Sequence, residues 1–278
     1  YGGEDCQIGL EESPEEYIRN LVEVFREVRN QLSEDGTLWV NIGDSYYNYR
    51  PGKGQALSKQ TVSNTKQDLP DKCARRGNKL EGLKEKDLIG IPWMLAFALR
   101  ADGWYLRQDI IWHKPNPMPE SVRDRCTKAH EYIFLFSKNK KYFYDNEAIK
   151  EPAKDWGTRD RTNGKYHNEG TGLRPHSGLT KSYPTKNKRS VWSITNKPYK
   201  GAHFATYPPD LIEPCILAGS EKGDIVLDPF MGSGTTAMVA KKLGRHYMGC
   251  ELHEDYGNLI DERTSPYINT LEKFYEGS

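Results

Sequence analysis

The segment Ile225–Thr236, which reads Ile-Val-Leu-Asp-Pro-Phe-Met-Gly-Ser-Gly-Thr-Thr, constrains the fold more than any other part of the chain. Its apolar start predicts a strand, which runs into an aspartate and a turn that contains Gly232 and Gly234. The alanines and valine that follow Thr235 predict a helix. Glycines at such a turn let a nucleoside cofactor approach the backbone closely. We therefore expect a nucleotide-binding strand–turn–helix unit.

The next predicted strand supports this interpretation, because His246–Cys250 ends on the acidic residue Glu251. In nucleotide-binding βαβ units, a carboxylate at this position accepts hydrogen bonds from the ribose hydroxyls. We expect Glu251 to be a bidentate acceptor of that kind. A dinucleotide fold would need a third glycine, where this chain has Thr236 and Ala237. An ordinary tight turn in an α/β domain is the alternative.

Strand and helix patterns alternate along the chain. The predicted strands are 37–42, 105–112, 131–137 with a hairpin partner at 140–144, 225–227 and 246–250, and the predicted helices begin after Ser13, at Trp93, at Leu211, at Thr235 and at Asp255. Such alternation favours an α/β fold with a mostly parallel sheet and helices on both faces. Ligand sites of such sheets lie at the carboxyl ends of the strands.

Two basic tracts interrupt this pattern, although the net charge is only +1. Residues 138–200 hold 15 Lys and Arg against 6 Asp and Glu, and residues 50–86 hold 10 against 4. Blocks of this kind commonly contact nucleic-acid phosphates, although solvated loop surface is the alternative. The candidate DNA contacts are Arg159, Arg161, Lys186, Lys188 and Arg189. Residues 47–85 show no sustained period and are expected to form a long loop.

The cysteines and histidines suggest neither disulfides nor a metal site. The five cysteines form no Cys-x-x-Cys pair, which favours a reducing compartment. We expect the cytoplasm, at the nucleoid of a bacterial or phage-infected cell, or the nucleus if the host is a eukaryote. Cys250 is expected to be a small buried side chain. His203 has no partner at metal-ligand spacing, so no metal is expected. No apolar run reaches 18 residues and no secretory leader is visible, so no membrane association is expected.

The spelling of the glycine turn, Asp-Pro-Phe-x-Gly-Ser-Gly-Thr-Thr, resembles the S-adenosyl-L-methionine loop of amino-group DNA methyltransferases, which make N4-methylcytosine or N6-methyladenine. Further blocks resemble the same family: 7–11, 36–46, 87–93, 112–117, 130–134 and 203–209. Their order, with the catalytic half before the cofactor half, resembles the permuted β type. The resemblance implies a Rossmann-like S-adenosylmethionine-dependent methyltransferase fold with a basic, loop-rich target-recognition insertion.

The resemblance also implies domains and site residues. Residues 1–137 would form the catalytic half, 138–200 the target-recognition region and 201–278 the cofactor-binding half. The expected cofactor-binding residues are Asp228, Pro229, Phe230, Gly232, Ser233, Gly234, Thr235, Thr236, Glu251, His203 and Phe204. Trp112 and Lys114 are candidates for the target-base pocket, although Trp112 could equally be a core residue.

One block of the family is absent from this sequence. Family members carry (Ser/Asp)-Pro-Pro-(Tyr/Phe) in the catalytic loop, and Tyr207-Pro-Pro-Asp210 is no substitute because its order is wrong. We expect the first strand and the catalytic loop to precede Tyr1. The catalytic residues are therefore unknown from this sequence.

The resemblance implies methyl transfer from S-adenosyl-L-methionine to the exocyclic amine of a base in double-stranded DNA. The blocks Asn41–Tyr46 and Lys114–Pro117 favour N4 of cytosine, and N6 of adenine stays open. The alternatives are a catalytically inactive DNA-binding module on the same fold, which the absent block motivates, and methylation of RNA or a small molecule. A cognate restriction endonuclease is a possible partner, and the oligomeric state is open.

Overall fold

A computed structural model describes residues 8–47, 80, 82–153, 184–196 and 207–267. The chain divides into two compact units, Tyr1–Tyr142 and Phe143–Ser278. The three-part division expected from the sequence stays a prediction. None of the helices among the described residues is long and apolar enough to cross a membrane.

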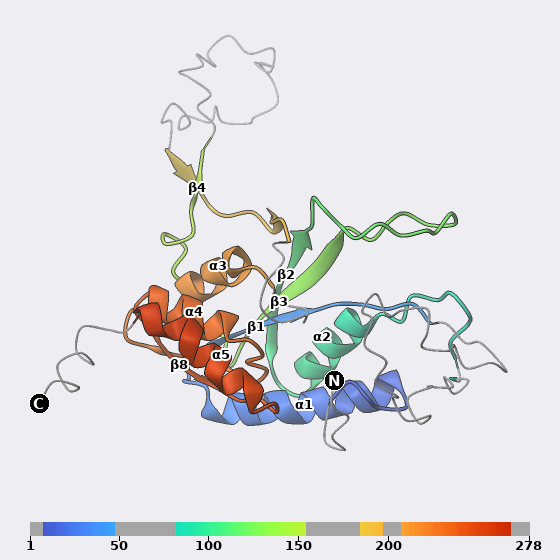
Figure 1. Ribbon diagram of the computed structural model, residues 1–278, viewed down its shortest axis with the longest axis horizontal. Helices are drawn as coiled ribbons and strands as arrows, with labels where there is room; N and C mark the ends of the chain where they lie inside the picture. Colours follow the sequence, from blue (N-terminus) through green and yellow to red (C-terminus); the bar gives the residue numbers. More distant parts are fainter. Residues whose placement is uncertain (1–7, 48–79, 81, 154–183, 197–206, 268–278) are drawn as a thin grey trace, which may run out of the picture. The chain divides into compact units, whose positions relative to one another are not determined.

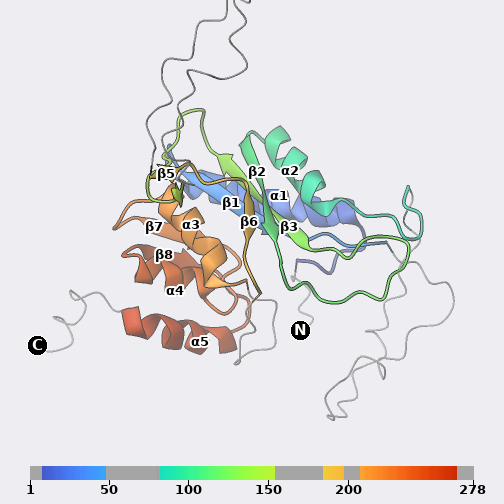
Figure 2. The same cartoon turned by 90° about the horizontal axis from the view of Figure 1, so that it is seen from above.

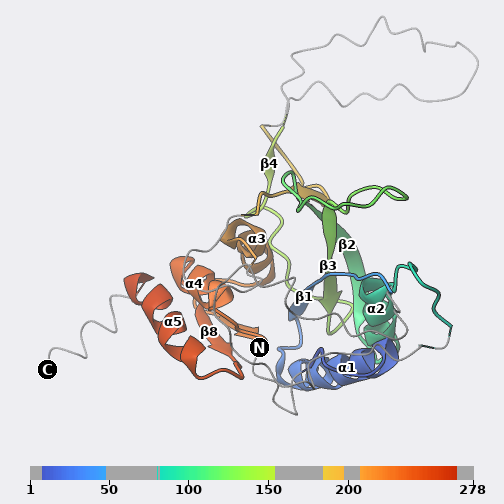
Figure 3. The ribbon, with the colours of Figure 1, turned by 45° about the vertical axis from the view of Figure 1, so that its right-hand side comes forward.

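The first unit contains two helices that pack together, α1 (Pro14–Gln31) and α2 (Ile91–Ala101) (Figure 3). Ser13 is the N-cap of α1, and its hydroxyl accepts a hydrogen bond from the Glu16 N–H at 3.2 Å, as the sequence predicts. The inner face of α1 buries side chains at helical spacing: Ile18, Leu21, Phe25 and Val28. The helix predicted to begin at Trp93 is confirmed as α2, which begins two residues earlier.

Three long strands form the sheet of the first unit: β1 (Thr37–Ile42), β2 (Tyr105–His113) and β3 (His130–Ser137) (Figure 1). Strand β3 lies between β1 and β2 and runs antiparallel to both. The expectation of a mostly parallel sheet is wrong for these pairs. The connection from β2 to β3 contains no helix, whereas a parallel pairing would need a crossover. Because β1 and β2 run the same way, their carboxyl ends share one edge of the sheet with the start of β3.

The core of the first unit is built around β3. Phe134 and Phe136 are among the most buried side chains of the described residues, together with Leu95 and Leu99 of α2. Phe134 also makes an edge contact with Trp93, with ring centroids 5.2 Å apart. In the second half of β3 the side chains of both faces are buried, so its near-continuous apolar run reflects a strand that is covered on both faces.

Asp44, two residues after β1, caps helix α2 from a distance in sequence. The N-cap of α2 is Gly90, which has a left-handed backbone and no side chain to cap the helix. The Asp44 Oδ1 atom accepts hydrogen bonds from the N–H groups of Gly90 and Ile91 at 3.0 and 3.1 Å. The end of β1 is thereby fixed to the start of α2.

The second unit contains one parallel pair, β7 (Ile225–Asp228) and β8 (His246–Gly249), with α4 (Thr235–Lys242) as the crossover. Helix α4 packs against both strands and against α3 (Pro209–Gly219) and α5 (Asp255–Thr264), so it is central to this unit (Figure 2). A 3₁₀ turn, Ser265–Tyr267, follows α5. Short strands complete the described part: β4 (Glu151–Pro152), which pairs antiparallel with β5 (Thr185–Lys186), and β6 (Val191–Ser193).

Two local expectations are wrong. Residues 140–144 form no strand, so β3 has no hairpin partner there. Cys250 is exposed, whereas Cys215 in α3 is buried. Tyr247 packs toward the α4 core, and the alternation of strand side chains puts Cys250 on the opposite face, with the exposed Met248.

We predict that Asp44→Ala lowers the free energy of unfolding by about 1–2 kcal/mol, because two N–H groups at the start of α2 lose their acceptor. Asp44→Asn keeps an acceptor oxygen and should lose less. Urea unfolding followed by circular dichroism measures the difference. Asp35→Ala at an exposed position is the control and should change stability little. Equal losses for Asp44→Ala and Asp35→Ala would contradict the capping role.

Candidate functional site

The glycine turn after β7 has the backbone conformation that its sequence predicts. Gly232 and Gly234 have φ values of +52° and +76°, in the left-handed region where a side chain is strained. The Gly234 N–H donates to the Met231 carbonyl at 3.0 Å, and the Met231 N–H donates to the Cys250 carbonyl at 2.9 Å. Helix α4 begins at Thr235, immediately after the turn. The turn therefore lies at the carboxyl ends of both β7 and β8.

The carboxylate of Asp228, the last residue of β7, binds this turn to its surroundings. Its Oδ1 atom accepts from the Phe230 N–H at 2.9 Å, and its Oδ2 atom accepts from the Thr236 hydroxyl at 2.5 Å. The hydroxyl of Tyr207 donates to the same Oδ2 atom at 3.4 Å and is also hydrogen-bonded to the Thr236 hydroxyl. Asp228 therefore connects the strand end, the first turn of α4 and the segment that precedes α3.

Tyr207 keeps its proton in this network. Burial, followed by the neighbouring Asp228 carboxylate, raises the pKa of the Tyr207 phenol above its ordinary value. Since the phenol stays neutral, it can donate to the carboxylate over the whole physiological pH range. Sequence reasoning missed Tyr207, because only folding brings it next to Asp228.

Glu251 lies just after β8 and faces the same turn. Its Oε2 atom accepts from the Gly232 N–H at 2.7 Å, and its Oε1 atom accepts from the His253 N–H at 3.0 Å. Each carboxylate oxygen has two lone pairs, so one on each oxygen stays available for a further donor. The carboxylate is thus fixed in direction and has the acceptor capacity that a pair of ribose hydroxyls requires.

Helix α5 packs against the glycine turn and stabilises it, which the sequence did not predict. A Cβ atom on Gly234 would lie 2.8 Å from the Ile260 Cγ1 atom, so glycine is required there by packing as well as by φ. The Arg263 guanidinium donates to the carbonyl and the hydroxyl of Ser233, both at 2.7 Å, and to the Thr235 hydroxyl at 3.2 Å. The helical pattern after Asp255 gave a helix, but nothing in it indicated which side chains would reach the turn.

Burial divides the predicted cofactor residues into two groups. Ser233, Thr235 and Thr236 are buried, so they shape the turn from inside. Phe230 is 49% exposed, and Asp228, Pro229, Gly232 and Glu251 are half-buried, so these residues are accessible to a ligand. His203 and Phe204 lie outside the described residues, as do the candidate DNA contacts Arg159 and Arg161.

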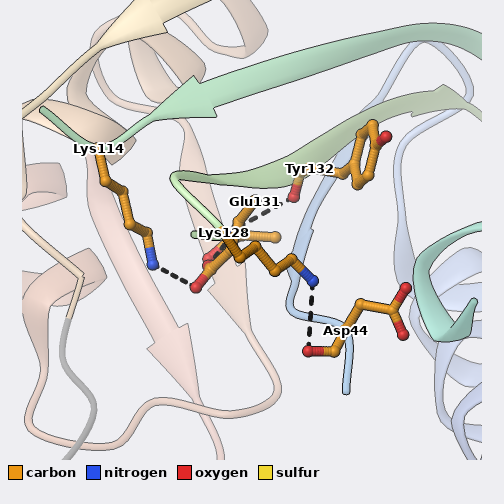
Figure 4. Close-up of polar contacts among 6 residues, drawn as sticks. Asp44, Lys114, Lys128, Glu131 and Tyr132 are labelled. Atoms are coloured by element: carbon orange, nitrogen blue, oxygen red, sulfur yellow. Dashed lines mark hydrogen bonds and ion pairs between the residues drawn. The ribbon is translucent and has the colours of Figure 1, made fainter. Parts of the chain in front are cut away.

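A second polar cluster lies at the edge of the first unit's sheet where β1 and β2 end (Figure 4). The ammonium of Lys114 pairs with the Glu131 carboxylate, which also accepts from the Asn41 amide at 3.3 Å. The same amide donates to the Tyr132 carbonyl at 3.0 Å, and the Lys128 ammonium donates to the Asp44 carbonyl at 3.3 Å. We call these residues the edge cluster: Asn41, Asp44, Lys114, Lys128, Glu131 and Tyr132.

The two residues predicted for the target-base pocket lie in this region but differ in exposure. Trp112 is only 3% exposed, and the Lys114 ammonium lies 4.2 Å from the centre of its ring. This burial favours a packing role for Trp112. Lys114 reaches the edge cluster itself through Glu131. The roles of both residues in base binding stay predictions.

Three of the predicted DNA contacts gather around one carboxylate. Lys186 and Lys188 lie 3.9 Å from the carboxylate of Glu151, and Arg189 lies 3.3 Å from it. Arg189 is the most accessible, with a side chain that is 74% exposed. The group therefore keeps an excess of two positive charges, which suits a phosphate contact.

The described residues contain no group of three or more side chains that could hold a metal ion. What they do contain is a strand–turn–helix unit with two ordered carboxylates at its carboxyl edge. A turn of this shape with a ribose-type acceptor defines an α/β protein of the nucleoside-cofactor class.

Comparisons with known proteins identify the family. The N6_N4_Mtase family model, described as DNA methylase, matches residues 1–262. The chain is 48% identical over 266 residues to the type II methyltransferase M.SmaI of Serratia marcescens, covering 94% of this chain and 78% of that protein. It is 46% identical to M.XycI of Xanthomonas campestris pv. cyanopsidis, covering 95% and 76%. The chain therefore belongs to the amino-group DNA methyltransferase family, as the sequence predicted.

Solved structures show the same fold. The PvuII DNA methyltransferase, described as cytosine-N4-specific, matches with a TM-score of 0.59 at 17% identity, covering 95% of this chain and 76% of that one. A DNA modification methylase homologue of Thermus thermophilus, solved in complex with S-adenosyl-L-methionine, matches with a TM-score of 0.55 at 23% identity, covering 92% and 79%. These likenesses confirm the expected α/β methyltransferase fold.

We predict that Gly234→Ala destabilises the protein more than Gly232→Ala. Both changes put a Cβ on a left-handed residue, at about 1–2 kcal/mol each. At Gly234 the Cβ would also meet Ile260, whereas at Gly232 the nearest atom is 3.9 Å away. Urea unfolding of the two variants measures the gap. Ile260→Ala should recover part of the Gly234→Ala loss in the double variant, and strict additivity of the two losses would contradict the clash.

Proposed function

We propose that the second unit binds S-adenosyl-L-methionine at the glycine turn and that the protein transfers its methyl group to the exocyclic amine of a base in double-stranded DNA. The observation that carries the cofactor assignment is the Glu251 carboxylate, held by the N–H groups of Gly232 and His253 at the carboxyl end of β8. Bound there, S-adenosyl-L-methionine supplies an electrophilic methyl group on a sulfonium.

The described residues fit this cofactor. The free lone pairs of Glu251 suit the two ribose hydroxyls. The left-handed glycines keep the backbone of the turn free of Cβ atoms. The ring of Phe230, which is 49% exposed beside the turn, offers an apolar face to the nucleoside. Asp228 keeps the turn in shape through Phe230 and Thr236.

The chain's contribution to methyl transfer is mainly positioning. An exocyclic amine conjugated to its ring is a poor nucleophile, and acceptors on its hydrogens push the lone pair toward the methyl group. No covalent enzyme intermediate is needed, so a cysteine nucleophile is not required. The target base must leave the duplex stack to reach the cofactor.

We propose N4 of cytosine as the acceptor, on the strength of the blocks Asn41–Tyr46 and Lys114–Pro117. The DNA contacts we propose in the described part are Lys186, Lys188 and Arg189, which are the cations gathered around Glu151. A type II restriction endonuclease of matching sequence specificity is the proposed partner, since the relatives are named type II methyltransferases. Such a pair would act in the bacterial cytoplasm.

We predict that Glu251→Gln weakens binding of S-adenosyl-L-methionine by about tenfold or more, because one oxygen that accepts a backbone N–H and a ribose hydroxyl becomes a donor. Isothermal titration calorimetry measures the dissociation constant. Glu254→Gln, at an exposed carboxylate three residues further on, is the matched control and should bind as the wild type does. Similar affinities for both variants would remove Glu251 from the site.

Methyl transfer itself is tested on the full-length protein. Labelled S-adenosyl-L-methionine is incubated with unmethylated plasmid DNA, and the product is digested to nucleosides. We expect the label in N4-methylcytosine. Label in N6-methyladenine would replace the proposed base, and label in RNA but not in duplex DNA would replace the proposed substrate. An absence of label in any nucleic acid would contradict the enzymatic function.

A further inference from the structure

The connection between β2 and β3, residues 114–129, leaves the edge of the first unit's sheet as a long, narrow excursion (Figure 1). We call it the arm. It contains no helix or strand, yet its base is closed, since the Lys114 N–H donates to the Ala129 carbonyl at 2.8 Å. The arm starts at the sheet edge where β1 and β2 both end, which is where ligand sites of such sheets lie.

The edge cluster holds both ends of the arm (Figure 4). At its start, Lys114 pairs with Glu131 on β3. At its end, the Lys128 ammonium donates to the carbonyl of Asp44, which also caps α2. The outgoing limb is therefore fixed to β3, and the returning limb to the segment that follows β1.

Further contacts hold the returning limb. The Arg125 guanidinium stacks on the Tyr46 ring, with its central carbon 3.8 Å from the ring centre, and pairs with Glu120 at 2.5 Å. Asp124 pairs with Lys86 at 2.7 Å. An unstructured connection of this length would rarely carry so many contacts, so the arm has a defined position on the first unit.

The outgoing limb is stiff and presents an apolar side chain. Pro115, Pro117 and Pro119 fix their own φ angles and restrict the residues that precede them. Met118, between two of these prolines, is 84% exposed, the largest value among the exposed large apolar side chains of the described residues. A single exposed apolar residue needs no explanation. Met118 differs because it lies on a stiff limb that is anchored at the sheet edge where ligand sites lie. Such a side chain loses little conformational entropy when it binds a partner.

Charge points to the partner. The arm carries four cations (Lys114, Arg123, Arg125 and Lys128) against two carboxylates (Glu120 and Asp124). Arg123 is exposed and makes no ion pair within the part of the chain that the structure describes. A basic arm with an exposed apolar side chain suits a polyanion whose interior is apolar, and duplex DNA has phosphates outside and stacked bases inside.

We propose that the arm contacts duplex DNA and that the Met118 side chain enters the base stack at the step next to the target base. The proposal rests on the proposed function, because a base that leaves the duplex opens the stack beside it. Apolar side chains, methionine among them, are inserted between base steps by other DNA-binding proteins and offset part of the unstacking cost. Arg123 contacts a neighbouring phosphate.

The test uses the full-length protein with Met118→Ala, Met118→Leu and Phe97→Ala. Phe97, on α2, is 48% exposed and lies outside the arm, so it controls for loss of exposed apolar surface. The recognition site is first identified by sequencing DNA that the wild type has methylated. The test duplex then carries this site, with 2-aminopurine next to the target base. Binding of S-adenosyl-L-homocysteine is measured separately by calorimetry.

We expect Met118→Ala to lower kcat/KM for DNA by about tenfold and to remove most of the 2-aminopurine fluorescence rise, because the opened stack loses its apolar filler. Met118→Leu should retain both within about threefold, since leucine has a similar volume. Phe97→Ala should match the wild type. All variants should bind S-adenosyl-L-homocysteine as the wild type does. Arg123→Ala should reduce the salt dependence of DNA binding by about one counterion.

Several outcomes would overturn the proposal. Wild-type values of kcat/KM and of fluorescence for Met118→Ala would show that the Met118 side chain does not enter DNA, while methylation by the wild type would leave the proposed function intact. Weaker S-adenosyl-L-homocysteine binding by Met118→Ala would assign Met118 a role in the fold instead. If the wild type methylates no duplex, the proposed function fails first, and the proposal for the arm fails with it.

Discussion

The carboxylate of Asp228 is the interaction on which the second unit depends. Three segments meet there: the strand β7, the first turn of α4 and the residue Tyr207 before α3. Because the carboxylate takes a backbone N–H and two hydroxyl groups, its charge is satisfied without a cation. These hydrogen bonds stabilise the glycine turn, whose left-handed backbone conformation few sequences would adopt without them. Glu251 and Arg263 add to this arrangement, but each of them acts on a turn whose entry Asp228 has already fixed.

Much of this unit could be predicted from the sequence because its signals are local. The apolar run before Asp228, the paired glycines and the acidic residue after the next strand lie within 27 residues, 225–251, and each has one strongly favoured geometry. The partners that hold the turn could not be predicted in the same way. Tyr207, Ile260 and Arg263 reach it only after α3 and α5 have packed on α4, and side-chain contacts of that kind leave no periodic trace in the sequence.

The first unit shows the same limit for strand direction. The periodicity of 37–42, 105–112 and 131–137 located all three strands, yet the expected parallel pairing was wrong, since pairing depends on the path of the connections. The helix cap of α2 was equally hidden. Gly90 offers no capping side chain, and its substitute, Asp44, lies 46 residues earlier in the chain. Cys250 was misplaced for a related reason, because one strand of a small sheet has both a covered and an open face.

The convergence of Lys186, Lys188 and Arg189 on Glu151 has a consequence for how tightly any polyanion is held. A phosphate that arrives there meets three cations that share one carboxylate, so it is attracted by an excess of two positive charges and not by three. The electrostatic attraction between this group and a phosphate is therefore weaker than that of three unpaired cations. A weaker contact dissociates faster. An enzyme that must release each product and find a new site along the same polymer benefits from such rapid dissociation.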